Sequence, residues 1–295
     1  MAAALVFVAA DRSAYAETLL LLGQIAKSRG LEPPRVLAGW TAAEWIYPNP
    51  DDALAEEVAD AVADRPVDWA LVPTENRRKR LLVADMDSTI INCECLDELA
   101  DYAGLKAEIA AITERAMRGE LAFEPALRER VVKLKGLALD TLQRCFDERV
   151  HLNPGARTLV RTMAAHDARC VLVSGGFSFF TSRVAALAGF HADRANTLID
   201  DGAALTGAVA EPILGRAAKR AALESEAATL GLAPVDALAI GDGANDLDMI
   251  GIAGLGVAYR AKPIVAAEAD AQIAHTALTT ALFFQGYAQA EFAVD

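Results

Sequence analysis

An apolar run, Leu81–Ala84, leads straight into two aspartates two residues apart, Asp85 and Asp87, with Ser88 and Thr89 next. A buried strand that ends this way places both carboxylates at the carboxyl edge of a sheet, where α/β proteins bind their ligands. Two neighbouring carboxylates repel each other and raise each other's pKa unless a cation or a proton compensates. The segment therefore predicts an α/β fold with a metal ion at this strand end, whereas a lone aspartate there would indicate only an acidic turn.

Two further polar motifs each follow an apolar run that we predict to be a strand of the same sheet. Ser174-Gly175-Gly176 is one, and its glycines let backbone N–H groups approach an anion closely. The other is a tight glycine turn flanked by Asp242 and Asp246. Parallel strands bring their carboxyl ends to one edge, so these groups should meet Asp85 there. Oxygen ligands at the spacing of the second aspartate pair suit Mg²⁺.

Composition narrows the range of partners. The 295 residues are 54% hydrophobic and carry a net charge of −13, from 28 basic and 41 acidic residues. This balance argues against a nucleic-acid partner, and an anionic substrate would need local cations. Four cysteines without zinc spacing or a paired framework indicate reduced thiols in a cytoplasmic protein. No apolar stretch reaches about 18 residues, so no membrane span is expected, and the first apolar run lacks the basic start of a signal peptide.

The length suggests two domains. Residues 1–76 are predicted to form a separate small α/β domain with a coarse βαββαβ pattern, and residues 77–295 a larger one. Within the larger domain, residues 94–151 contain good helix formers and no convincing strand. They predict a helical insertion in a core made of residues 77–93 and 152–295.

Three local predictions concern segments outside the strand-end motifs. The basic run Arg77-Arg78-Lys79-Arg80 is interpreted as a solvated linker rather than a binding patch. The runs Ala195–Ile199 and Ala204–Val209 predict a β-hairpin. Lys219 falls on a predicted helix, Leu214–Leu230, where an isolated lysine is more often solvated than functional.

In chain order, the motifs DxDST, SGG, a lysine and GDGxND resemble the haloacid dehalogenase (HAD) superfamily of phosphatases. The resemblance covers about residues 81 to 273. It implies a Rossmann-like core with a helical cap inserted after the first motif. It also implies a Mg²⁺-dependent phosphomonoesterase that works through an aspartyl-phosphate intermediate.

The resemblance assigns a role to each motif residue. Asp85 would be the nucleophile, and Asp87 the general acid and base. For the first step Asp87 must be protonated, which requires a pKa well above about 4. The phosphoryl group would be held by Ser174, Gly175, Lys219 and Asn245. The metal would be held by Asp85, the backbone carbonyl of Asp87, Asp242 and, from the edge of the site, Asp246.

Residues on the cap side are similar to those of the phosphoserine phosphatases within the superfamily. The similarity implies hydrolysis of O-phospho-L-serine, the last step of serine biosynthesis. Glu94 would face the substrate ammonium and Arg130 its carboxylate, since a zwitterion is read by one anion and one cation. The alternatives are an ordinary ion pair between the two, and Arg128 in the place of Arg130. The segments that carry this similarity are Asp85–Glu98, Met117-Arg118-Gly119, Phe123–Val131 with the following Leu134-Lys135, and the SGGF segment Ser174–Phe177.

Residues 1–76 resemble the small amino-acid-binding (ACT-like) domains found on such phosphatases, by the order of their elements alone. The resemblance implies either a regulator site, for example for serine, or a packing or dimerisation module that would form a homodimer. Two other functions remain open. One is a phosphatase or phosphotransferase for another small amino-alcohol phosphate. The other is a non-catalytic amino-acid sensor, although a sensor has no need of Asp87.

Overall fold

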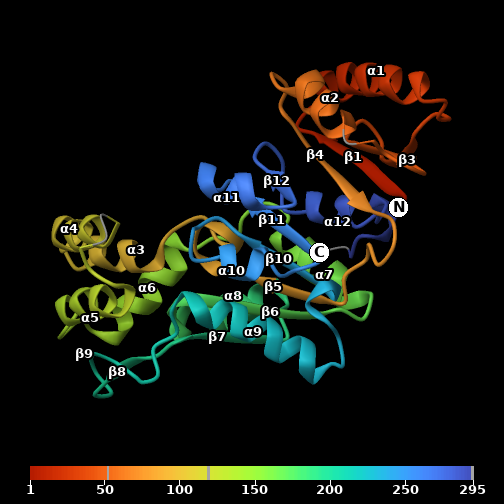
Figure 1. The fold of residues 1–295 in the computed structure, drawn as a ribbon. Coiled ribbons are helices and arrows are strands. Elements are labelled where there is room, and N and C mark those ends of the chain that lie inside the picture. The colour runs from red at the N-terminus through yellow and green to blue at the C-terminus, as the bar shows by residue number, and fades with distance from the viewer. Residues whose placement is uncertain (52, 118–119, 294–295) are drawn as a thin grey trace.

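The computed structural model describes residues 1–51, 53–117 and 120–293. Its main element is a six-stranded sheet with helices on both faces and the strand order β12-β11-β10-β5-β6-β7 (Figure 1). Neighbouring strands in this sheet are parallel, as predicted. The strands are β5 (Leu81–Ala84), β6 (Arg169–Phe177), β7 (Ala192–Asn196), β10 (Ala237–Gly241), β11 (Leu255–Tyr259) and β12 (Ala271–Ile273).

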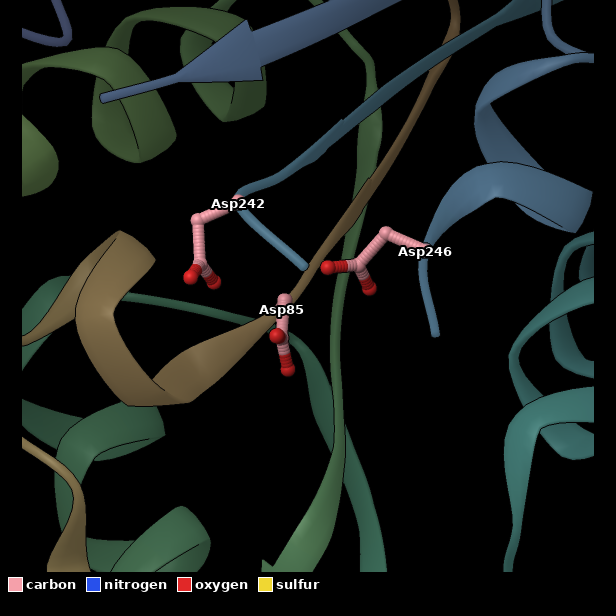
Figure 2. Close-up of side chains that lie close together, drawn as sticks. All are labelled: Asp85, Asp242 and Asp246. Carbon is pink, nitrogen blue, oxygen red and sulfur yellow. The ribbon is translucent and has the colours of Figure 1, made fainter. Parts of the chain in front are cut away.

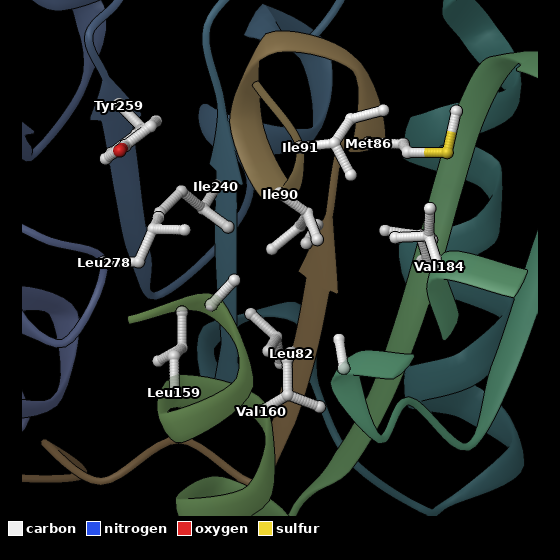
Figure 3. Close-up of a cluster of buried hydrophobic side chains, with 14 of the residues drawn as sticks. Leu82, Met86, Ile90, Ile91, Leu159, Val160, Val184, Ile240, Tyr259 and Leu278 are labelled. Carbon is white, nitrogen blue, oxygen red and sulfur yellow. The ribbon is translucent and has the colours of Figure 1, made fainter. Parts of the chain in front are cut away.

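Strand β5 is apolar along its whole length because both faces of the sheet are covered. Leu82 and Ala84 pack into the cluster on one face, and Figure 3 shows Leu82 there with Leu159 and Val160. The alternate side chains of β5 pack into a different cluster on the opposite face. Continuous apolar strands are typical of parallel sheets that helices cover on both sides. The helices are α7 (Ala156–Ala165), α8 (Ser178–Ala188) and α12 (Thr280–Phe284) on the first face, and α9 (Arg216–Thr229), α10 (Leu247–Ile250) and α11 (Pro263–Glu268) on the second.

A helical insertion separates β5 from β6, where the sequence predicts one. Its two ends meet: Ile91 and Leu152 form an antiparallel bridge, and the Asn92 N–H donates to the His151 carbonyl at 3.0 Å. The insertion therefore leaves and re-enters the core through one narrow neck. Residues 118 and 119 of the predicted segment Met117-Arg118-Gly119 lie outside the described residues, and so does the side chain of Met117. The helices are α3 (Cys95–Tyr102), α4 (Lys106–Met117), α5 (Phe123–Lys133) and α6 (Leu139–Arg149).

The predicted hairpin begins later than the sequence indicates. Strand β8 (Leu198–Asp200) pairs antiparallel with β9 (Leu205–Val209), whereas residues 195 and 196 belong to β7 at the edge of the main sheet. Asn196 ends β7 because its buried side chain bonds to backbone groups of two other segments. The hairpin contacts the insertion, since the Gly136 N–H donates to the Leu205 carbonyl at 2.8 Å.

The N-terminal residues form an antiparallel four-stranded sheet of order β2-β3-β1-β4, with two helices on one face (Figure 1). The elements follow the predicted order βαββαβ. They are β1 (Ala3–Ala9), α1 (Arg12–Ser28), β2 (Arg35–Ala38), β3 (Ala42–Tyr47), α2 (Ala53–Val62) and β4 (Val67–Pro73).

The second face of the N-terminal sheet is buried against the larger unit. In β1, Leu5 and Phe7 pack with the residues of α1 and α2. Val6 and Val8 point the other way and join the cluster that contains α12. This burial explains why every residue of β1 is buried. The N-terminal unit is therefore packed against the larger unit through this second face.

The prediction of a solvated linker at residues 77–80 is wrong for two of the four residues. Lys79 is 7% exposed, and the side chain of Arg77 is 11% exposed. Arg77 donates to the buried Glu44 carboxylate at 2.6 Å and to the Phe284 carbonyl at 2.7 Å. The segment bends at Arg78 and Arg80 before it enters β5, and the side chains of Arg77 and Lys79 are the two that turn inward. Long-range pairing therefore decides which basic residues are buried.

Two further observations concern the thiols and the helices of the described residues. All four cysteines carry free thiols. Among the described residues, no helix combines the length and apolarity needed to cross a bilayer.

Candidate active site

Three carboxylates meet at the carboxyl edge of the parallel sheet. Asp85 follows β5, and Asp242 and Asp246 follow the neighbouring strand β10. Each offers one oxygen, and these oxygens lie within 4.8 Å of one another; Figure 2 shows the three side chains close together. Asp246 is fully buried, and Asp85 is almost fully buried. The predicted meeting of the first and last motifs is confirmed.

Lys219 lies between two of these carboxylates. Its Nζ is 2.6 Å from Asp85 Oδ1 and 2.6 Å from Asp246 Oδ1, and its side chain is buried. The solvated alternative for this lysine is therefore wrong. Three carboxylates face one ammonium, which leaves two negative charges in excess. A divalent cation would neutralise that excess, and carboxylate oxygens are the donors that Mg²⁺ prefers.

The pKa shifts at the cluster have a common cause, which is negative charge held away from water. Burial raises the pKa of Asp85, and the charge of Asp246 raises it further, while Lys219 opposes both. Burial also raises the pKa of Asp242, with Asp246 adding to the effect. Burial by itself would lower the pKa of Lys219, but the two carboxylates outweigh it and hold that pKa above its usual value. A bound cation would relieve the repulsion and favour ionised ligands.

Asp87 lies beside the cluster and has different partners. Its Oδ1 accepts from the backbone N–H of Cys95 at 2.9 Å, and its Oδ2 accepts from Ser174 Oγ at 2.9 Å. Burial raises the pKa of Asp87, and these hydrogen bonds oppose the shift. Cys95 is the first residue of α3, so the insertion contributes directly to the site. A raised pKa is what a carboxyl group needs to donate a proton near neutral pH.

The turn η1 (Met86–Ile90) directs the two hydroxyl residues of the first motif. Ser88 has φ 56°, in the left-handed region that few non-glycine residues adopt. In this conformation its Oγ donates to Glu94 Oε1 at 2.6 Å. Thr89 Oγ1 donates to Asp242 Oδ1 at 3.2 Å, so the same turn also contacts the acid cluster.

Two buried asparagines that the sequence reasoning missed hold the loops of the site. Asn153 donates from Nδ2 to the carbonyls of Thr89 and Ile91, each at 2.8 Å. Asn196 donates to the Gly175 carbonyl at 2.8 Å and so fixes the glycine loop. The available signals were an Asn-Pro-Gly turn and a polar residue at a strand end, both typical of side-chain to backbone bonding. Neither signal identifies the distant partner. Thr89 was missed as a partner of the acid cluster for the same reason.

Glu94 and Arg130 interact electrostatically but do not form an ordinary ion pair. Arg130 donates from Nε to the Ala126 carbonyl at 3.2 Å, and no carboxylate of the described residues lies within 4.0 Å of its guanidinium. Burial lowers the pKa of Arg130, while Asp97 and Glu94 oppose the shift. Desolvation and the charge of Asp87 raise the pKa of Glu94 to about 7. The site thus holds an anion and a cation that do not neutralise each other directly.

Arg128, the alternative to Arg130, points elsewhere. Its guanidinium pairs with Glu211, which follows β9, and its side chain is 45% exposed. This pairing joins the insertion to the segment after the hairpin. Of the two arginines on α5, Arg130 is therefore the one without a carboxylate partner among the described residues.

Two predicted phosphate contacts differ in their surroundings. Gly175 permits a close approach, since a Cβ there would lie 3.3 Å from the Phe123 ring. Its neighbour Gly176 donates from its backbone N–H to Ser174 Oγ at 2.8 Å.

Asn245 is exposed and lies over Gly243, where a Cβ would be 2.3 Å from Asn245 Oδ1. Asn245 is thus exposed, whereas its neighbour Asp246 is buried in the acid cluster.

The parallel sheet, its three strand-end motifs and the buried Lys219 on α9 define a hydrolase class that the family comparison identifies. Residues 82–250 match the haloacid dehalogenase-like hydrolases, and the chain belongs to this family. Within the family, its relatives include the phosphoserine phosphatases. A phosphoserine phosphatase of Polaromonas is 46% identical over 195 residues, which are 64% of this chain and 83% of that protein.

Among solved structures, phosphoserine phosphatases are also similar to this chain. A probable phosphoserine phosphatase from Vibrio cholerae has a TM-score of 0.78 at 27% identity, and the match covers 98% of this chain and 88% of that chain. A phosphoserine phosphatase solved with its substrate bound has a TM-score of 0.65 at 36% identity, over 70% of this chain and 98% of that chain. The first match extends over the N-terminal unit as well as the core.

Proposed function

We propose that this enzyme hydrolyses O-phospho-L-serine to L-serine and phosphate, the last step of serine biosynthesis. The observation that carries the proposal is that Glu94 stands near Asp87 and Arg130 stands near Glu94, without a direct ion pair between Glu94 and Arg130. Phosphoserine carries an ammonium and a carboxylate beside its phosphate, so it supplies a partner for each. The similarity to phosphoserine phosphatases supports the same substrate.

The residues around Asp85 suit a two-step phosphoryl transfer. Asp85 attacks phosphorus, the bond between phosphorus and the serine oxygen breaks, and an aspartyl phosphate forms. Protonated Asp87 gives its proton to the leaving alkoxide, and its raised pKa supports this role. Asp87 then takes a proton from the water that cleaves the aspartyl phosphate. Ser174, Gly175, Lys219 and Asn245 are the groups we assign to the phosphoryl oxygens.

We assign Mg²⁺ to the acid cluster. Asp85 and Asp242 would hold it together with the backbone carbonyl of Asp87, and Asp246 would support it from the edge. The donor set fits because it consists of oxygens and carries two negative charges in excess of Lys219. When bound, the ion stabilises the negative charge of the transferring phosphoryl group.

We further propose that residues 94–151 act as a cap and residues 1–76 as an ACT-like domain. The Cys95 N–H on Asp87 and the packing of Phe123 on the Gly175 loop support closure of the insertion over the site. A closed cap excludes water and must open to release product. The βαββαβ order supports the second assignment. A homodimer through the N-terminal unit and a cytoplasmic location stay predictions.

Two other functions fit the described contacts less well. A phosphatase or phosphotransferase for phosphoethanolamine or a similar ester would use Glu94 but leave Arg130 without a carboxylate. A non-catalytic sensor would not require the bonded pair of Asp87 and Ser174 beside the acid cluster.

The test is phosphate release from phosphoserine, phosphoethanolamine, glycerol phosphate and nitrophenyl phosphate, each with Mg²⁺ and with a chelator. We expect kcat/KM for phosphoserine to exceed the others by roughly 100-fold, because a site built for two charged groups rejects esters that lack them. Equal rates on all four esters would contradict the substrate. Full activity of Asp85→Asn would contradict the mechanism.

A further inference from the structure

A cavity of about 520 Å³ lies at the edge of the parallel sheet opposite to the acid cluster. It is bounded by the end of β4, the segment leading into β5, and the start of β11. Lys79 lines it and stands six residues before Asp85 along a nearly extended chain, so roughly 20 Å separates the two sites. None of the residues assigned above to catalysis lines this cavity.

Lys79 brings a buried positive charge to the cavity. Its side chain is buried, and Nζ donates to the carbonyls of Asn76 at 2.8 Å and Val235 at 3.0 Å. An ammonium has three protons, so these two bonds leave one donor unused. Within the described part of the chain, no carboxylate lies within 4.0 Å of this ammonium. Burial lowers the pKa of Lys79, and the charges of Asp236 and Asp270, both beyond salt-bridge distance, oppose the shift.

The neighbours of Lys79 keep this arrangement in place. A Cβ on Gly254 would lie 1.8 Å from the Val235 carbonyl oxygen and 2.7 Å from Lys79 Nζ, so glycine leaves the room that the ammonium occupies. Arg77 also lines the cavity, but it is paired with Glu44. Of the two basic side chains that line the cavity, Lys79 is thus the one without a carboxylate within 4.0 Å in the described part of the chain.

The remaining walls limit the size and charge of a ligand. Leu71, Leu255 and Phe284 provide apolar surface. Glu75 and Asp270 also line the cavity, and their charges disfavour a ligand with more than one negative charge. The volume is in the range of small-molecule sites.

We propose that this cavity binds a small monocarboxylate with an apolar body, its carboxylate on Lys79 and its body against the apolar walls. Two sources share this chemistry. A simple short-chain carboxylic acid offers the carboxylate and the chain. An α-amino acid with an apolar side chain adds an ammonium, for which Asp270 stands on the wall.

The test is calorimetric titration of the full chain with valerate, norvaline and the neutral isostere valeramide. We expect at least one acid to bind roughly 10-fold or more tightly than the amide, since a charge-assisted hydrogen bond contributes that much. Lys79→Gln should remove the difference, and Lys27→Gln, which changes the same charge at an exposed lysine, should retain it. Tighter binding of norvaline would identify an amino acid as the source, and tighter binding of valerate a simple acid.

Two further variants keep the result decisive. Arg130→Gln removes the proposed carboxylate contact of the active site, so binding in the cavity should survive in this variant. Val235→Trp enlarges a half-exposed side chain of the cavity wall, keeps the backbone carbonyl that accepts from Lys79, and should abolish binding even if Lys79→Gln does not fold. Equal affinity of acids and amide, binding lost only in Arg130→Gln, or full binding in Val235→Trp would each overturn the proposal.

Discussion

Ser88 donates a 2.6 Å hydrogen bond to the Glu94 carboxylate from within the turn that also carries Asp87. The bond depends on the left-handed backbone of Ser88, which turns the hydroxyl toward the insertion. The turn that places the proposed general acid therefore also positions the proposed acceptor of the substrate ammonium. The same bond lowers the pKa of Glu94, which desolvation and Asp87 raise to about 7.

We expect the KM for phosphoserine to rise as the pH falls below about 7. Glu94 is charged above its pKa and neutral below it, so acid removes its attraction for the ammonium. Ser88→Gly deletes the hydroxyl and tolerates the positive φ; it should raise the pKa of Glu94 and move the increase in KM to higher pH. Steady-state kinetics across pH measure both effects. Glycerol phosphate, which has no ammonium, controls for titration of the phosphate group. The same rise in KM at low pH with this ester would contradict the role of Glu94.

We expect Arg130→Gln to lower kcat/KM for phosphoserine by roughly 10- to 100-fold through loss of a charge-assisted contact. The same variant should leave kcat/KM for phosphoethanolamine nearly unchanged, because that ester has no carboxylate. Arg128→Gln is the matched control on the same helix. It breaks a partly exposed pair with Glu211 and should change kcat/KM by no more than about twofold. An equal loss on both esters would show that Arg130 does not read the carboxylate.

Thr89→Val should raise the Mg²⁺ concentration for half-maximal activity by roughly 10-fold, because outer partners of metal ligands tune affinity on that scale. Valine keeps the shape of threonine but cannot donate to Asp242. A Mg²⁺ titration of activity after chelation measures the shift. Thr162→Val removes another buried hydroxyl, which accepts from Ala293 N–H, and serves as the control. The same half-maximal concentration in both variants would refute the positioning role.

Asp68→Ala should destabilise the protein by about 3 kcal/mol, since hydrogen bonds to charged groups are strong and their loss leaves donors unpaired. The buried Asp68 on β4 accepts backbone N–H groups from Ala274, His275 and Thr276 of the larger unit. Urea unfolding measures the free energy of unfolding. Asp60→Ala, at an exposed aspartate of α2, should change it by less than about 0.5 kcal/mol. Equal stability of the two variants would mean that Asp68 does not join the two units.

The strands that end in candidate active-site residues can be predicted, because the sequence features that mark them lie within or next to each strand. β5, β6 and β10 are apolar runs that end in polar motifs, and the structure brings these ends to one edge. Strand β3 is harder to locate because Glu44 lies within it. That residue is buried with two partners, Arg35 opposite it on the neighbouring strand β2 and Arg77 from the segment before β5.

The sequence by itself determined the α/β class, the helical insertion and the aspartates of the first and last motifs. These follow from periodicity and from residue types at strand ends, which local spacing contains. Tertiary structure alone decided that Lys219 bridges Asp85 and Asp246 and that Lys79 is buried. It also decided that, among the described residues, Arg128 pairs with a carboxylate and Arg130 does not. The physical reason is that the pairing and burial of a charged side chain depend on which other groups surround it away from water. Those groups come from segments that sequence spacing does not place together.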